Sequence, residues 1–142
     1  MAEIHHEIKV RASPERIRRA LSDPQDLQAW HGGRVTAGQD GWRFEIADGA
    51  PTFRWEIEQA ANGVVWKCVE GPGNSVGTQA SFTISGDADK DRTLVEFAHR
   101  GWPHTDGAFR KCDTQWAILL HHLRQFLETG VASPALKAPA DE

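Results

Sequence analysis

The stretch 106–130, DGAFRKCDTQWAILLHHLRQFLETG, predicts one long amphipathic helix near the end of the chain. Its large apolar residues recur at i, i+3, i+7, i+11, i+14 and i+18, a spacing that gathers them on one side of a helix. They are Phe109, Cys112, Trp116, Leu120, Leu123 and Leu127. Gly130 follows, and glycine commonly ends a helix. We therefore expect a helix over 106–129 with one apolar side.

The segments before this helix have the pattern of β-strands. Ile4, His6, Ile8 and Val10 alternate with polar residues, as in a strand with one buried face. Further strands are predicted, with turn residues between them, at 42–47, 52–59, 64–70, 76–85 and 93–100, and a short one at 34–36. The connections are short, which favours an antiparallel meander. The clearer strands each carry one bulky row, so the sheet has one well-filled face.

Two short helices are predicted between the first strand and the rest of the sheet. Ser13, Pro14 and Glu15 stand in the order of a helix cap, a first-position proline and an early acidic residue. Asp23 caps a second helix in the same way, and this helix ends at the glycine pair 32–33. The segment between the first two strands is therefore helical.

This order of elements predicts an α+β protein with the helix-grip fold, in which a curved antiparallel sheet wraps around a long C-terminal helix. The 142 residues fit one domain. We assign it to residues 1–130. Residues 131–142 are rich in alanine and proline without periodicity, which predicts a flexible tail.

Composition excludes several classes of function. A formal net charge of -4 with both signs scattered gives no basic stripe for nucleic acid and no polybasic stretch for a membrane surface. No apolar run is long enough to predict a membrane span. The N-terminus lacks a secretory signal, and two widely spaced cysteines favour reduced thiols in a cytoplasmic protein. Six tryptophans, six phenylalanines and no tyrosine favour a large apolar interior.

Cofactor and metal sites are not expected. The pairs His5–His6 and His121–His122 place neighbouring side chains on different faces, so neither supplies converging metal ligands. The sequence contains no nucleophile elbow and no phosphate-cradling loop after a strand. A homodimer is compatible with the sequence.

Four segments resemble the SRPBCC superfamily, which includes START and birch-pollen-allergen-like proteins. They are VRASPERIRRALSDPQDLQAW (10–30), VEGPGNSVGTQASFTI (69–84), LVEFAHRGW (94–102) and TQWAILLHHLRQFLETG (114–130). The resemblance is closest to the branch named after the activator of the heat-shock protein 90 ATPase. The eukaryotic activator also has a separate N-terminal domain that these residues do not match, so activation of that chaperone is not expected. The superfamily includes carriers, receptors and cyclases, so the resemblance implies a fold more firmly than a function.

A sheet folded around a helix encloses a space lined by the inward strand residues and the helix stripe. The predicted ligand-binding residues are those whose side chains face this space or its rim. They are Trp30 and His31 at the rim, with Trp55, Trp66, Phe97, His99, Phe109, Asp113, Trp116 and Leu120. Aromatic residues at these spacings more often fill a core than hold a ligand, so both interpretations stay open.

Three functions are compatible with this set of residues. The first is a carrier or sensor that binds a small hydrophobic or aromatic molecule in the enclosed space. The second is an enzyme of the cyclase or hydratase type, in which His99 or Asp113 moves a proton. The third is a protein-interaction domain resembling a co-chaperone, which predicts an exposed apolar patch. No residue is assigned as catalytic on the sequence alone.

The segment Trp30–Gly33 departs from the pattern of the resembling family. Many relatives carry a second tryptophan followed by Gly-Pro here, whereas this chain has His31 followed by two glycines. The local wall is therefore less bulky and more polar. The glycines are explained by a turn at the end of the second helix. We predict that His31 acts as a gate that distinguishes the ligand of this protein from those of its relatives.

Overall fold

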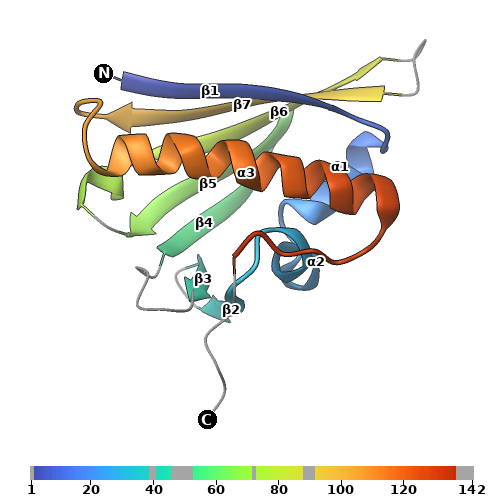
Figure 1. The fold of residues 1–142 in the computed structure, drawn as a ribbon, viewed down its shortest axis with the longest axis horizontal. Helices are drawn as coiled ribbons and strands as arrows, with labels where there is room; N and C mark the ends of the chain where they lie inside the picture. The colour runs from blue at the N-terminus through green and yellow to red at the C-terminus, as the bar shows by residue number, and fades with distance from the viewer. Residues whose placement is uncertain (1, 39–40, 46–52, 72, 88–91, 137–142) are drawn as a thin grey trace.

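The computed structural model describes residues 2–38, 41–45, 53–71, 73–87 and 92–136. Its strands and helices follow the predicted order (Figure 1). The elements are β1 (Ala2–Val10), α1 (Pro14–Ala20), α2 (Pro24–Trp30), β2 (Arg34–Gly38), β3 (Gly41–Glu45), β4 (Phe53–Ala60), β5 (Gly63–Glu70), the short 3-10 helix η1 (Gly73–Ser75), β6 (Gln79–Asp87), β7 (Arg92–Trp102) and α3 (Ala108–Thr129).

Within these described residues, the strands form one seven-stranded sheet in the order β1-β7-β6-β5-β4-β3-β2. Every neighbouring pair is antiparallel. The strands β2 to β7 follow one another as a meander, and β1 adds to the far side of β7, with Ile4 opposite His99. The predicted α+β helix-grip fold is confirmed.

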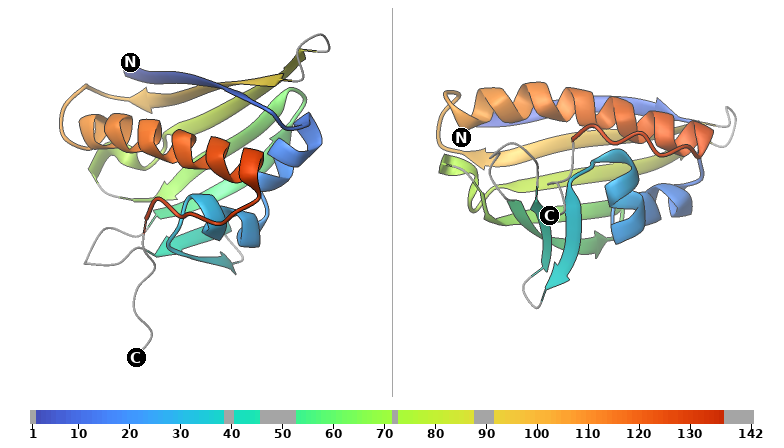
Figure 2. Two further views of the ribbon diagram at one scale, coloured as in Figure 1. Left: turned by 45° about the vertical axis from the view of Figure 1, so that its right-hand side comes forward. Right: turned by 60° about the horizontal axis from the view of Figure 1, so that its bottom comes forward.

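The two short helices begin where the sequence places their caps. The Ser13 hydroxyl oxygen accepts a hydrogen bond from the backbone N–H of Arg16 at 3.2 Å. A carboxylate oxygen of Asp23 accepts from the backbone N–H groups of Gln25 and Asp26 at 2.9 and 3.2 Å. These bonds satisfy N–H groups that have no partner inside a helix. Figure 2 shows α1 and α2 beside α3 at one end of the sheet.

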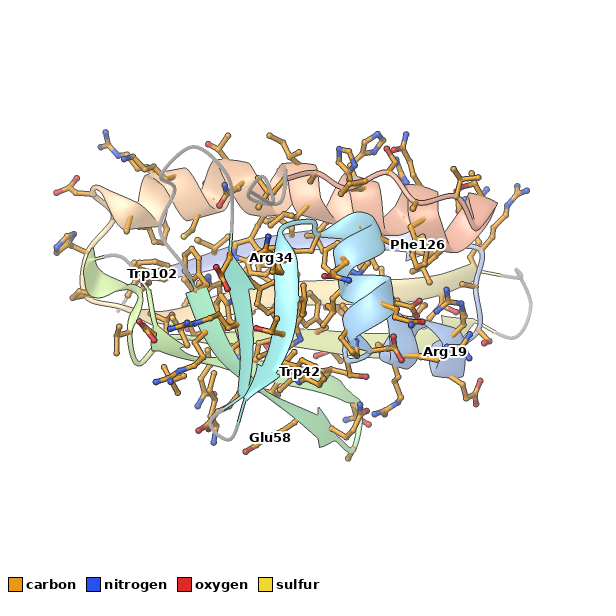
Figure 3. All side chains as sticks on the ribbon, turned by 90° about the horizontal axis from the view of Figure 1, so that it is seen from below. Arg19, Arg34, Trp42, Glu58, Trp102 and Phe126 are labelled. Atoms are coloured by element: carbon orange, nitrogen blue, oxygen red, sulfur yellow. The ribbon has the colours of Figure 1, made fainter. Side chains whose placement is uncertain are left out.

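The long helix α3 covers one face of the curved sheet (Figures 1 and 2). Its buried residues are Cys112, Trp116, Leu119, Leu120, Leu123 and Phe126. Phe109 and Leu127, which belong to the predicted stripe, are only half-buried, and Leu119 and Phe126 complete the buried side instead. Figure 3 shows side chains filling the layer beside α3 between Trp102 and Phe126. None of the described helices is both long and apolar enough to cross a membrane.

The strand beginning at 76 in the prediction starts three residues later in the structure. Gly73–Ser75 form η1, and the Thr78 hydroxyl donates a hydrogen bond to the carbonyl of Ser75 at 2.5 Å, which folds this stretch into a turn before β6. Two predicted strand ends, 46–47 and 52, lie outside the described residues.

The segment after α3 is the first part of the stretch 131–142, which was predicted to be a flexible tail. Residues 131–136, the C-terminal segment, turn back along α2 (Figure 1). Ser133, Ala135 and Leu136 donate backbone hydrogen bonds to the carbonyls of Ala29, Trp30 and His31 at 2.9, 3.0 and 3.1 Å. The last carbonyls of a helix have no hydrogen-bond partner inside the helix. The backbone N–H groups of the C-terminal segment provide these partners for α2. Residues 137–142 lie outside the described residues.

Candidate functional site

The centre of the protein is an aromatic layer between the sheet and α3, and Trp66 lies in its middle. The Trp66 side chain is fully buried, and its Nε1 donates a hydrogen bond to the carbonyl of Leu21 at 3.0 Å. The rings whose centroids lie 5.2 to 6.2 Å from that of Trp66 belong to Trp30, His31, Phe44, Trp55, Phe82 and Trp116. Most of the space predicted to hold a ligand is therefore occupied by these rings.

Several residues predicted to line a cavity are part of this filled layer. Trp30 lies inside the core rather than at the rim, because its Nε1 donates to the carbonyl of Ala20 at 2.8 Å and its side chain has no exposed area. Phe97 packs on Trp116 with ring centroids 4.5 Å apart, and Leu120 is also buried. These residues act as packing partners of the layer.

His99 is fully buried, and both of its ring nitrogens are used. Trp116 Nε1 donates to His99 Nδ1 at 3.0 Å, so the ring hydrogen lies on Nε2. That nitrogen donates to Thr78 Oγ1 at 2.7 Å, and Thr78 donates onward to Ser75. Burial lowers the pKa of His99 to about 4, so the ring is neutral at neutral pH. No nitrogen of His99 is left to contact a ligand.

Asp113 and Phe109 lie near the start of α3, outside the cluster of rings that surrounds Trp66. Asp113 is half-exposed, and its carboxylate lies 3.0 Å from Nε2 of His6, a histidine of β1. Phe109 packs edge-on against Trp102 with ring centroids 5.9 Å apart. Both residues tie α3 to the sheet.

A small void remains between β4, α3, the end of α2 and the C-terminal segment. Its volume is about 20 Å³. We call this place the interior site, and it is lined by His31, Phe53, Trp55, Cys112, Gln115, Trp116, Leu119 and Leu136. Among the predicted ligand-binding residues, the structure brings His31, Trp55 and Trp116 together here. A void of this size holds at most one water molecule.

His31 forms the wall of the interior site at the end of α2. Its side chain is 5% exposed and its ring lies against that of Phe44, with centroids 4.6 Å apart. Its Nδ1 lies 3.2 Å from the carbonyl oxygen of Gly32. Burial lowers the pKa of His31 to about 4, and the hydrogen bond to Gly32 opposes only part of this effect. The imidazole is therefore neutral at neutral pH.

The C-terminal segment closes the interior site from outside. Leu136 reaches the lining, and its carbonyl accepts a hydrogen bond from the backbone N–H of Gly33 at 3.2 Å. Gly32 has a φ of 91°, and a Cβ at this position would lie 1.9 Å from the carbonyl oxygen of Leu136. Glycine is thus required both by the backbone conformation and by the close approach of the segment.

The lining of the interior site suits an apolar ligand with one polar group. Gln115 and His31 are its polar residues, and Gln115 provides both a donor and an acceptor. Burial raises the pKa of the Cys112 thiol to about 11, with a smaller contribution from Cys68 nearby. This thiol is protonated at neutral pH and is therefore a poor nucleophile.

Five lining residues were not predicted as site residues. Phe53 and Cys112 belong to the bulky rows that the sequence shows, and extending the site along these rows finds them. Gln115 and Leu119 each precede a stripe residue on α3, and a broader helical face includes both. Leu136 lies in a segment without periodicity, and the sequence contains no signal that places it here.

The comparisons with known proteins agree with this architecture. The chain is 30% identical to the protein in the solution structure of the Aha1 dimer from Colwellia psychrerythraea, over 92% of this chain and 98% of that one, with a TM-score of 0.74. Lower identities, 20% and 15%, relate it to DynU16 of the dynemicin biosynthetic locus and to XoxI from Bacillus cereus, each with a TM-score of 0.71. These two likenesses show the fold alone.

The matches differ in how much of each protein they cover. The alignment covers 95% of this chain but 50% of DynU16, so the chain spans half of that protein's length. For XoxI the alignment covers 89% of this chain and 96% of that one. No family model and no curated protein matches the sequence.

Proposed function

Because this chain belongs to the SRPBCC superfamily, in the branch named after the activator of the heat-shock protein 90 ATPase, we propose that it binds a small hydrophobic or aromatic molecule at the interior site. The observation that carries this proposal is the lining: aromatic and aliphatic side chains surround a void with two neutral polar groups, Gln115 and His31. Such a lining is typical of small-molecule sites. The protein then acts as a carrier or sensor.

The ligand enters by displacing the C-terminal segment. The void of about 20 Å³ is far smaller than a ligand, so the lining has to move. The segment is attached to α2 through backbone hydrogen bonds, each of which contributes about 1 kcal/mol net. Residues 130–134 are exposed, so little apolar area holds them in place. Removing Leu136 from the lining is therefore the least costly way to enlarge the site.

A fluorescence titration with N-phenyl-1-naphthylamine, an uncharged aromatic probe, tests this proposal. We expect saturable binding by the full chain, seen as probe enhancement and tryptophan quenching. Leu119→Phe fills the void and is expected to weaken binding about tenfold, an effect comparable to adding one or two methylenes to a filled pocket. Ile118→Phe, at the neighbouring half-exposed position, is the matched control and should bind as the unaltered chain does.

Two outcomes would contradict binding at the interior site. If the unaltered chain and Leu136→Ala both leave the probe unbound, the interior site is a core without a ligand. If Leu119→Phe and Ile118→Phe lower binding equally, the probe binds elsewhere. Melting temperatures of all variants separate a lost site from a lost fold.

The enzyme alternative has weaker support in the geometry. Proton transfer needs a group within hydrogen-bond reach of a substrate. His99 uses both nitrogens inside the core, and Asp113 contacts His6 at the surface. Neither belongs to the lining of the interior site. We therefore propose binding without turnover.

The proposal also covers the oligomeric state of the protein and its cellular compartment. The similar protein from Colwellia psychrerythraea was solved as a dimer, and we propose a homodimer here, to be tested by light scattering of the full chain. The free, buried thiols of Cys68 and Cys112 support a reducing compartment, and we propose the cytoplasm.

A further inference from the structure

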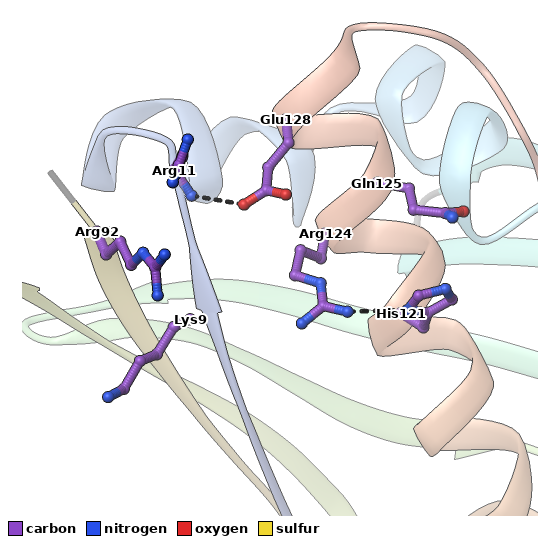
Figure 4. A pocket seen from close by; sticks show the side chains of 7 residues that line it. All are labelled: Lys9, Arg11, Arg92, His121, Arg124, Gln125 and Glu128. Carbon is purple, nitrogen blue, oxygen red and sulfur yellow. Dashed lines mark hydrogen bonds between the residues drawn. The ribbon is translucent and has the colours of Figure 1, made fainter.

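A second concave site lies on the outside of the protein, where the end of β1 and the start of β7 approach the last turns of α3 (Figure 4). Its volume is about 530 Å³, and it shares no lining residue with the interior site. Small-molecule sites commonly have volumes of about 300 to 1,000 Å³. We call this place the basic groove.

The basic groove concentrates positive charge in a chain that is negative overall. Its lining includes four permanent cations, Lys9, Arg11, Arg92 and Arg124, and one acidic residue, Glu128. The formal charge of these five is positive, whereas the whole chain carries -4. Among the residues that the structure describes, no side chain forms an ion pair with any of the four cations. The positive charges of the groove repel one another, and a bound anion relieves this repulsion.

The groups of the groove are arranged as hydrogen-bond donors. Arg124 Nη2 lies 3.2 Å from His121 Nδ1 and donates to it, which leaves the ring hydrogen of His121 on Nε2. Glu128 is held within the groove, because its Oε2 accepts the backbone N–H of Arg11, another lining residue, at 3.0 Å. Figure 4 shows Lys9, Arg11 and Arg92 on one side of the groove, and Arg124 and Glu128 on the helix opposite.

We propose that the basic groove binds a soluble small molecule bearing a multiply charged phosphate group. Guanidinium groups present paired N–H donors that match phosphate oxygens, and Lys9 adds a point charge. The concave shape and the volume favour a small molecule over the flat surface of a bilayer. This ligand and the apolar ligand of the interior site occupy different places, so either proposal can fail without the other.

Calorimetric titration of the full chain with tripolyphosphate tests the groove. We expect saturable binding that weakens as salt is raised, because salt screens exposed charges. Arg124→Gln should weaken binding about tenfold, the effect of losing a charge-assisted pair of hydrogen bonds. The matched control is Arg43→Gln, which removes the same charge from an exposed position on β3 outside the groove and should leave binding unchanged.

A gain of affinity gives a test that misfolding cannot imitate. Glu128→Gln removes the one carboxylate of the groove while its amide oxygen can still accept the Arg11 N–H. We expect it to tighten tripolyphosphate binding about threefold, since a like charge beside the anion is lost. Unchanged or weaker binding by Glu128→Gln overturns the proposed position of the anion.

Two further outcomes would contradict the binding of a phosphate-bearing small molecule in the basic groove. Equal loss of binding in Arg124→Gln and Arg43→Gln means that the anion responds to net charge alone. A second arm sediments the chain with phosphatidylcholine vesicles, with and without phosphatidylglycerol. Binding to the phosphatidylglycerol vesicles without binding to tripolyphosphate overturns the small-molecule proposal in favour of a lipid surface.

Discussion

His99 and His31 are buried in the same region of the protein, yet they are held in different ways. Burial lowers the pKa of each to about 4. His99 joins three parts of the chain, because β7 carries it, α3 supplies Trp116 and the turn before β6 supplies Thr78. The ring of His31 makes one hydrogen bond with the described residues, to the carbonyl of the next residue.

This difference separates a fixed part of the protein from an adaptable part. Around His99, any movement of α3 against the sheet breaks a buried hydrogen bond, and an unsatisfied buried polar group costs about 1 to 3 kcal/mol. Around His31, the wall is completed by a segment at the end of the chain that is attached through its backbone. Burial alone therefore does not tell which histidine is structural. The hydrogen-bond partners of each imidazole ring show which histidine holds elements of the fold together.

The largest expected effect is a loss of stability in acid. An unfolded histidine has a pKa near 6.5, whereas folded His31 and His99 have values of about 4. Between these values the unfolded state binds protons that the folded state does not, so the free energy of unfolding falls as pH falls. We expect the loss to begin below pH 6.5 and to reach about 3 kcal/mol for each histidine near pH 4. Urea unfolding at a series of pH values measures it.

Single variants assign this loss to its two sources. His31→Phe should remove about 3 kcal/mol of the fall between pH 6.5 and pH 4, because carboxylates that titrate in the same range affect both chains equally. If the slope is the same with and without His31, that ring is protonated in the folded protein. His31 would then not be a buried neutral histidine as His99 is.

His99→Phe is expected to destabilise the protein by about 2 to 4 kcal/mol at pH 7, because Trp116 Nε1 loses its acceptor and Thr78 Oγ1 loses the donor that His99 provides. Denaturant unfolding measures the change. His99→Gln restores one acceptor and one donor, so it should recover part of the loss. A change below about 1 kcal/mol for His99→Phe would mean that water replaces the ring, and that this part of the core is less rigid than the hydrogen bonds indicate.

Gly32→Ala should cost about 2 kcal/mol, partly from a positive φ and partly from the contact with Leu136. Gly77→Ala is the matched control, because Gly77 has a φ of 90° and its added Cβ meets nothing within 4 Å. It should cost about 1 kcal/mol. Hydrogen exchange at the N–H of Leu136 should accelerate in Gly32→Ala alone. Equal costs and equal exchange would show that the segment does not depend on Gly32.

Regular patterns in the sequence predicted the fold correctly. The caps at Ser13 and Asp23, the alternation in β1 and the stripe on α3 are local signals, and each appears in the structure. The aromatic rows also predicted which side chains turn inward. They did not predict how completely these rings fill the space, because that depends on how side chains from distant strands interlock.

The interior site was predicted only in part for a similar reason. His31, Trp55 and Trp116 lie in elements with clear periodicity. Leu136 reaches the site because the end of α2 presents free carbonyls to a segment about 100 residues later in the chain. Nothing in the composition of 131–142 announces this pairing. The sequence alone also could not place Asp113 beside His6, because which residue of β1 meets α3 depends on how the helix packs across the sheet.

The smallest expected effect at neutral pH belongs to His31→Phe. The substitution keeps an aromatic ring against Phe44 and loses one hydrogen bond of 3.2 Å, so the free energy of unfolding at pH 7 should change by less than about 1 kcal/mol. Affinity for N-phenyl-1-naphthylamine should hold, whereas a probe of similar shape with a hydroxyl group, such as 2-naphthol, should lose the contribution of the imidazole. Titrating each probe against the unaltered chain and against His31→Phe under the same conditions measures this difference in affinity. A large loss of stability would place His31 with His99 among the structural histidines, and an unchanged preference between the probes would remove it from ligand selection.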